Sequence, residues 1–138
     1  MSIGIIFNQS CDKEYILKTN FVYKNQTKDN VNIVLYNQEG EKFYTYLIEP
    51  SKEITVVITS DGPKTGVNTP FWLGYGKIAA KVVVKFDASN KCLTYIENEG
   101  ILDYKSYDNY DKSMRDKSNN TLIYNIDDEE LNIATLCE

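Results

Sequence analysis

Apolar and polar side chains alternate with a period of two residues in short runs that recur along this chain. Runs of this kind lie at residues 17–25, 31–36, 42–48, 53–59, 77–86, 92–96 and 121–126. In the second run Val31, Ile33 and Leu35 share one face, so that face is apolar. β-Branched and aromatic residues dominate these runs, and they favour pleated, half-buried surfaces. The pattern predicts an all-β protein.

A single stretch near the C-terminus predicts a helix. Asp127 can cap it, Glu130 follows three residues later as in a capping box, and Leu131 and Ala134 then share one side. No repeat, proline-rich linker or shift in composition marks a domain boundary. Two sheets that each bury one alternating face suit such a chain. We therefore expect a single antiparallel β-sandwich of about seven or eight strands with one short C-terminal helix.

The composition narrows the range of functions that this chain could have. Of 138 residues, 42% are hydrophobic and 25% are charged, which is ordinary for a soluble domain. Fifteen basic against 20 acidic residues give a net charge of -5, so a nucleic acid is not an expected partner. The chain has no histidine, the commonest general base and zinc ligand, and no nucleophile-elbow, P-loop or dinucleotide-binding motif. We expect no enzyme activity, catalytic residue, cofactor or metal.

The N-terminus carries an apolar run that ends at a cysteine. Residues 1–10 have no charged side chain, and the chain becomes charged immediately after Cys11. This resembles the end of a bacterial lipoprotein signal peptide, in which the peptidase cuts before a cysteine whose thiol carries the lipid. The resemblance implies a signal-peptide remnant at 1–10, a palmitate-type lipid on Cys11 and one sandwich domain at 11–138. The alternative is an N-terminal strand at residues 3–7; a helical membrane span needs about 20 apolar residues.

Two further cysteines remain, Cys92 and Cys137. If Cys11 is lipidated, they are left as a candidate disulfide that closes a loop of about 45 residues. The alternative is two buried thiols, and sequence spacing alone does not decide between them.

Aromatic residues gather in the glycine-rich connection at residues 60–76. Phe71, Trp72 and Tyr75 are candidate ligand contacts, because loop aromatics can stack on sugar rings or anchor a protein partner. The alternative is that Phe71 and Trp72 fold down and plug the open end of the sandwich.

A second long connection, at residues 100–120, is rich in Asp and Tyr. Several aspartates could hold Ca²⁺, but their spacing does not match an EF-hand loop. We expect a solvated surface loop without a metal.

The order of motifs along the whole chain carries a family resemblance. The runs at 81–87 and 91–95 are followed by Ser106-Tyr107 and by the acidic stretch at 124–134. This series, with two earlier hairpins at 20–36 and 46–58, resembles small lipoproteins of the Bacteroidetes. The likeness covers about residues 11–136. It implies an immunoglobulin-like sandwich in an outer-membrane lipoprotein, either periplasmic or surface-exposed. The family has no known active site whose residues could be assigned to positions in this sequence.

These observations predict a non-catalytic binding or structural module at the cell envelope. Its partners would be the membrane, through the lipid on Cys11, and a protein or glycan ligand. One alternative is an immunity or inhibitor protein whose acidic face covers a basic partner. Another is a glycan-binding accessory or adhesin module that uses Trp72 and the loop tyrosines.

Overall fold

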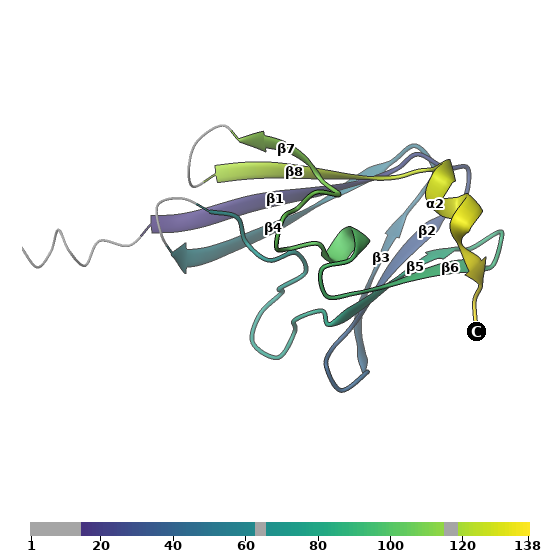
Figure 1. The fold of residues 1–138 in the computed structure, drawn as a ribbon, viewed down its shortest axis with the longest axis horizontal. Helices are drawn as coiled ribbons and strands as arrows, with labels where there is room; N and C mark the ends of the chain where they lie inside the picture. The colour runs from purple at the N-terminus through teal and green to yellow at the C-terminus, as the bar shows by residue number, and fades with distance from the viewer. Residues whose placement is uncertain (1–14, 63–65, 115–118) are drawn as a thin grey trace, which may run out of the picture.

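The computed structural model describes residues 15–62, 66–114 and 119–138, which form two packed β-sheets and one short α-helix (Figure 1). In chain order the elements are β1 (Tyr15–Asn25), β2 (Val31–Tyr36), β3 (Lys42–Ile48), β4 (Glu53–Gly62), β5 (Lys81–Phe86), β6 (Lys91–Ile96), the 3-10 turn η1 (Gly100–Leu102), β7 (Asp111–Met114), β8 (Asn119–Ile126), α2 (Asp128–Ile133) and β9 (Thr135–Leu136). The predicted all-β sandwich with a short C-terminal helix is confirmed. The described ranges hold nine strands, and the short β7 and β9 account for the excess over the prediction.

The strand order divides the sandwich into a four-stranded and a five-stranded sheet. The first has the order β4-β1-β8-β7 and the second has the order β3-β2-β5-β6-β9. Among the described strands all pairs are antiparallel except β1 and β8, which run parallel over eight residue pairs from Lys18↔Asn119 to Asn25↔Ile126. The parallel pairing places the start of β1 and the helix that follows β8 at opposite ends of the sandwich (Figure 1).

The core lies between the sheets and follows the alternation of the sequence. Strands β2 and β5 alternate buried and partly exposed residues along their full length. The fully buried side chains include Phe21, Tyr23, Val31, Ile33, Leu35, Val82, Val84, Phe86, Leu122 and Ile126. Burying such a side chain contributes about 1.5–3 kcal/mol, so the alternating faces supply the main driving force for folding.

Helix α2 closes the end of the sandwich where β1 and β8 finish. The Asp127 carboxylate accepts a hydrogen bond from the Glu130 backbone N–H at 3.1 Å, as the capping pattern predicts. The Glu130 carboxylate in turn accepts hydrogen bonds from the hydroxyls of Tyr95 (2.6 Å) and Tyr124 (2.8 Å). One acidic residue therefore joins the helix to β6 and β8, one strand from each sheet.

The described part of the connection at residues 100–120 is only in part the solvated surface loop that the sequence predicts, with Lys105, Ser106, Asp108 and Asn109 exposed. Ile101, Leu102 and Tyr110 are buried in the core, and residues 111–114 form β7 against β8. The buried Asp103 organises this segment, since its carboxylate accepts hydrogen bonds from the backbone N–H groups of Ser106, Asp108 and Asn109.

Strand β5 begins four residues later than the predicted run at 77–86. Residues 77–80 belong instead to the end of the β4–β5 loop, where Ile78 forms an isolated bridge with Trp72 and the Ala79 N–H donates to the Phe71 carbonyl at 3.2 Å. Alternation of apolar residues therefore continues beyond the strand that it marks.

Candidate functional site

Two neighbouring aromatic residues of the β4–β5 loop have opposite environments. Phe71 is fully buried and stacks on Tyr23, with ring centroids 4.9 Å apart and an interplanar angle of 17°. Trp72 is 50% exposed. The structure therefore makes Phe71 part of the core and leaves the Trp72 indole available at the surface.

Backbone conformation produces this separation. Phe71 has a φ of 58°, in the left-handed region that residues with a Cβ rarely adopt. A tight turn follows, in which the Leu73 N–H donates to the Lys77 carbonyl at 2.8 Å and the Lys77 N–H donates to the Gly74 carbonyl at 3.0 Å. Left-handed backbone costs an L-residue about 1–2 kcal/mol, and the buried Phe71 ring offsets that cost.

The buried Asn68 ties the loop to the four-stranded sheet. Its side-chain amide donates to the carbonyls of Leu17 in β1 and Ile58 in β4, each at 2.9 Å. Its side-chain oxygen accepts a hydrogen bond from the Ser60 hydroxyl at 2.5 Å. These bonds hold the backbone just before Phe71 and Trp72, so the indole is presented from a fixed position.

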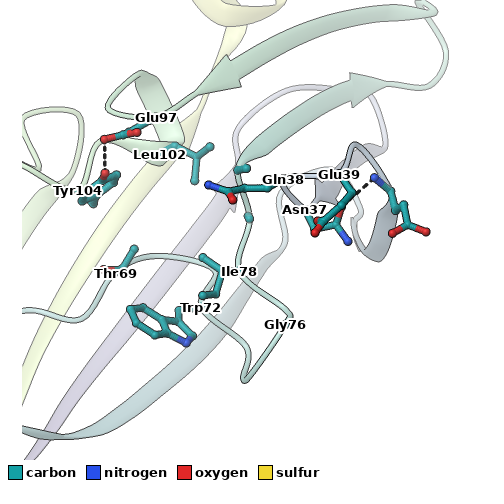
Figure 2. Close-up of a pocket in the computed structure, with 13 residues that line it drawn as sticks. Asn37, Gln38, Glu39, Thr69, Trp72, Gly76, Ile78, Glu97, Leu102 and Tyr104 are labelled. Carbon is teal, nitrogen blue, oxygen red and sulfur yellow. Dashed lines mark hydrogen bonds between the residues drawn. The ribbon is translucent and has the colours of Figure 1, made fainter.

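Trp72 borders two cavities. The first, which we call the indole cavity, has a volume of about 540 Å³ and lies between the β4–β5 loop, the β2–β3 hairpin and the segment around η1 (Figure 2). Its lining is Asn37, Gln38, Glu39, Glu41, Thr69, Trp72, Gly76, Ile78, Ala79, Ala80, Glu97, Leu102 and Tyr104. The second, the edge cavity, has a volume of about 580 Å³ and lies between the same loop and the edge strand β4. The two cavities share Thr69 and Trp72, so the indole stands between them.

The charged groups of the indole cavity all have one sign. Glu39, Glu41 and Glu97 line it, and its lining includes no lysine or arginine. The Tyr104 hydroxyl donates a hydrogen bond to the Glu97 carboxylate, and this bond raises the pKa of Tyr104 above its ordinary value (Figure 2). The cavity therefore combines an aromatic surface with three acidic side chains.

The structure brings together a different set of residues from the one that the sequence suggests. Of Phe71, Trp72 and Tyr75, only Trp72 lines a described cavity; Tyr75 is fully exposed outside both. Glu39 and Glu41 come from the β2–β3 hairpin, Glu97 and Tyr104 come from a second segment far from it in the chain, and no sequence motif marks them. Cys11 lies outside the described residues.

Cys92 and Cys137 are joined by a disulfide in the structure, with their Cα atoms 5.0 Å apart. The bond links β6 to the residue that follows β9, beside the pairs Lys91↔Leu136 and Cys92↔Thr135. It lies on the five-stranded sheet and lines neither Trp72 cavity.

Two carboxylates with shifted pKa values lie elsewhere in the fold. Burial raises the pKa of Glu130 above its ordinary value, and the hydrogen bonds from Tyr95 and Tyr124 offset only part of the rise. Burial would also raise the pKa of Asp103, but the hydrogen bonds from Ser106, Asp108 and Asn109 outweigh it and lower the pKa. Both groups are engaged in holding the fold.

Comparisons with protein-family models, with curated proteins and with solved structures find no match to this chain. Within the described ranges, no group of three or more histidine, cysteine, aspartate or glutamate residues is arranged to hold a metal ion. No helix among the residues that the structure describes is long and apolar enough to cross a membrane. Fold and geometry together define a β-sandwich that presents one half-exposed indole between two cavities.

Proposed function

We propose that this protein is a non-catalytic binding module of the cell envelope, held to a membrane by a lipid on Cys11, with its ligand site around Trp72. The observation that carries the binding role is the half-exposed indole between two cavities. Ligand sites of proteins are concave, largely apolar and furnished with a few polar groups, and the indole cavity has these features. Its volume of about 540 Å³ lies within the usual range.

The anchoring of Asn68 and Phe71 supports a binding role for Trp72. Asn68 anchors the loop to two strands and Phe71 anchors it to the core, so the indole is held in place before a ligand arrives. A preorganised contact loses little conformational entropy on binding.

The disulfide supports an address outside the reducing cytosol. Disulfides persist in the periplasm and on cell surfaces, where lipoproteins also reside. An exported chain with three cysteines, two of them paired in the structure, has one thiol left for another role, and a lipid on Cys11 fits that role.

The hydrogen bonds of the two buried acidic residues, Glu130 and Asp103, support a non-catalytic role. Glu130 accepts hydrogen bonds from two tyrosines and Asp103 from several loop groups, so neither is directed at either Trp72 cavity.

Replacing Trp72 by alanine tests the binding role. We expect the free energy of unfolding to change by about 1 kcal/mol or less, because the side chain is half-exposed. Immobilised wild-type protein should retain its partner from an envelope extract, and the Trp72→Ala variant should lose it. Tyr75→Ala is the matched control, since it removes a fully exposed aromatic that lines neither cavity. Equal retention by the wild type and Trp72→Ala would reject the site.

Metabolic labelling with an alkyne fatty acid tests the anchor. The protein, expressed from its intact gene in a bacterial host that makes lipoproteins, should incorporate the label and fractionate with membranes. Cys11→Ser should do neither, whereas the double variant Cys92→Ser/Cys137→Ser should keep the label. Label on the Cys11→Ser protein, or none on the wild type, would remove the lipoprotein part of the proposal.

A further inference from the structure

We infer that the indole cavity receives a lysine or arginine side chain from a basic segment of a partner protein. The inference rests on the proposed binding role of Trp72 and names the chemistry of its ligand.

Charge is the first argument. The cavity concentrates Glu39, Glu41 and Glu97 in one concave site whose lining holds no basic residue. Clefts lined by charges of one sign focus the field and raise the local concentration of the opposite charge. Sugar hydroxyls can donate hydrogen bonds to a carboxylate but carry no charge, whereas an ammonium or guanidinium group is attracted by the charge of all three carboxylates.

The indole is the second argument. Among aromatic side chains, tryptophan is the best partner for a cation placed over its ring face. Trp72 lines the cavity together with the carboxylates, and Figure 2 shows that the indole, Glu97 and Glu39 come from three separate segments. A cation that enters from solvent therefore meets an aromatic face and anionic groups in the same cavity.

Size favours a protein segment over a small amine. The indole cavity and the edge cavity adjoin at Thr69 and Trp72, and each is as large as the site of a drug-sized ligand. The edge cavity is lined by residues 57–61 of β4, which is an edge strand of its sheet. A peptide segment can place one basic side chain beside the indole and continue along β4, and a free polyamine has no groups for the second cavity.

The single tryptophan makes the test direct, because fluorescence excited at wavelengths that the 11 tyrosines do not absorb reports Trp72 alone. Oligolysine and oligoarginine peptides should shift the emission in a saturable titration. A neutral glycine–serine peptide and maltopentaose should not, and spermidine should bind more weakly than either peptide. Raising the ionic strength from about 0.01 M to about 1 M shortens the Debye length from about 30 Å to about 3 Å and should weaken the binding strongly.

Carboxylate variants locate the interaction. The triple variant Glu39→Gln/Glu41→Gln/Glu97→Gln should raise the Kd at least about fivefold, the combined effect expected of three exposed ion pairs. Glu49→Gln is the matched control: it removes an exposed carboxylate beyond the other end of β3, about 25 Å along the strand from Glu41, and should leave the Kd unchanged.

Several results would overturn the inference and leave the binding role standing. These are a response to maltopentaose, a Kd for spermidine as low as that for the peptides, or basic-peptide binding that the triple variant does not weaken. A lack of response to every cationic probe would also overturn it. Failure of the proposed function is separate, because it appears as retention of the envelope partner by Trp72→Ala.

Discussion

Replacing Phe71 by alanine is expected to lower the free energy of unfolding by about 3–5 kcal/mol, the usual loss when a buried phenylalanine is truncated. Phe71 is fully buried, stacks on Tyr23 and lies 6.2 Å from Tyr46 between ring centroids. The truncation opens a void between the sheets and leaves the left-handed backbone at this position without the packing that offsets it. Urea titration followed by far-UV circular dichroism measures the change.

Two further variants separate packing from backbone strain. Phe71→Leu keeps most of the apolar volume and should lose less stability than alanine. Phe71→Gly has the same void but tolerates the φ of 58°, so we expect it to be no less stable than Phe71→Ala. A Phe71→Ala protein with the unfolding midpoint of the wild type would contradict the assignment of Phe71 to the core.

Removing the Cys92–Cys137 disulfide is expected to lower the free energy of unfolding by about 2–4 kcal/mol. The bond closes a loop with a sequence separation of 45, for which chain entropy predicts roughly 4 kcal/mol. That loop contains η1, β7, β8 and α2, and β9 alone could not hold its end, because it pairs with β6 through only two residues. Thermal unfolding of Cys92→Ser/Cys137→Ser against the oxidised wild type measures the difference.

A reducing agent supplies the control for the disulfide. It should lower the melting temperature of the wild type to that of the double serine variant and leave the variant unchanged. A variant that melts with the oxidised wild type would show that the bond contributes nothing to stability.

The sequence predicted the sandwich well where strands bury one face. In β2 and β5 the apolar residues recur at every second position, and the observed burial follows them. The N-cap Asp127 likewise predicted the start of α2, because its hydrogen bond to the Glu130 N–H is local. The second half of the predicted capping box does not form, since the Glu130 carboxylate accepts hydrogen bonds from Tyr95 and Tyr124 instead. The parallel pairing of β1 with β8 was not predicted, since it joins residues about 100 positions apart and leaves no local pattern.

The connection at residues 100–120 shows where composition misleads. Its aspartates and tyrosines favour a solvated loop, yet the Asp103 carboxylate accepts backbone hydrogen bonds that the segment would otherwise make with water. Tyr110 enters the core because its hydroxyl reaches the Tyr23 hydroxyl at 3.1 Å and the Ile101 carbonyl. Polar residues are buried here because partners from distant segments satisfy them.

The candidate site was predicted only in part. Trp72 was identified because loop aromatics are suited to contacts, but the pattern could not separate it from Phe71. The positive φ that turns the two side chains apart depends on the packing of Phe71 against Tyr23, which is a tertiary contact. Glu97 and Glu39 are ordinary surface acids in the sequence, and only the fold places them in one cavity.

The direction of β1 has a consequence for how the domain would stand on a bilayer. Leu17 and Asp61, which line the edge cavity, lie at the end where β1 begins, and α2 lies at the opposite end. Cys11 precedes Tyr15 by four positions, a span of about 14 Å at full extension. In a protein lipidated at Cys11, the edge cavity would therefore lie close to the lipid headgroups, and α2 would lie at the end farther from the membrane. Proteins anchored in the same leaflet would reach Trp72 from the side of the sandwich. A large molecule that approaches from the solvent would first meet α2.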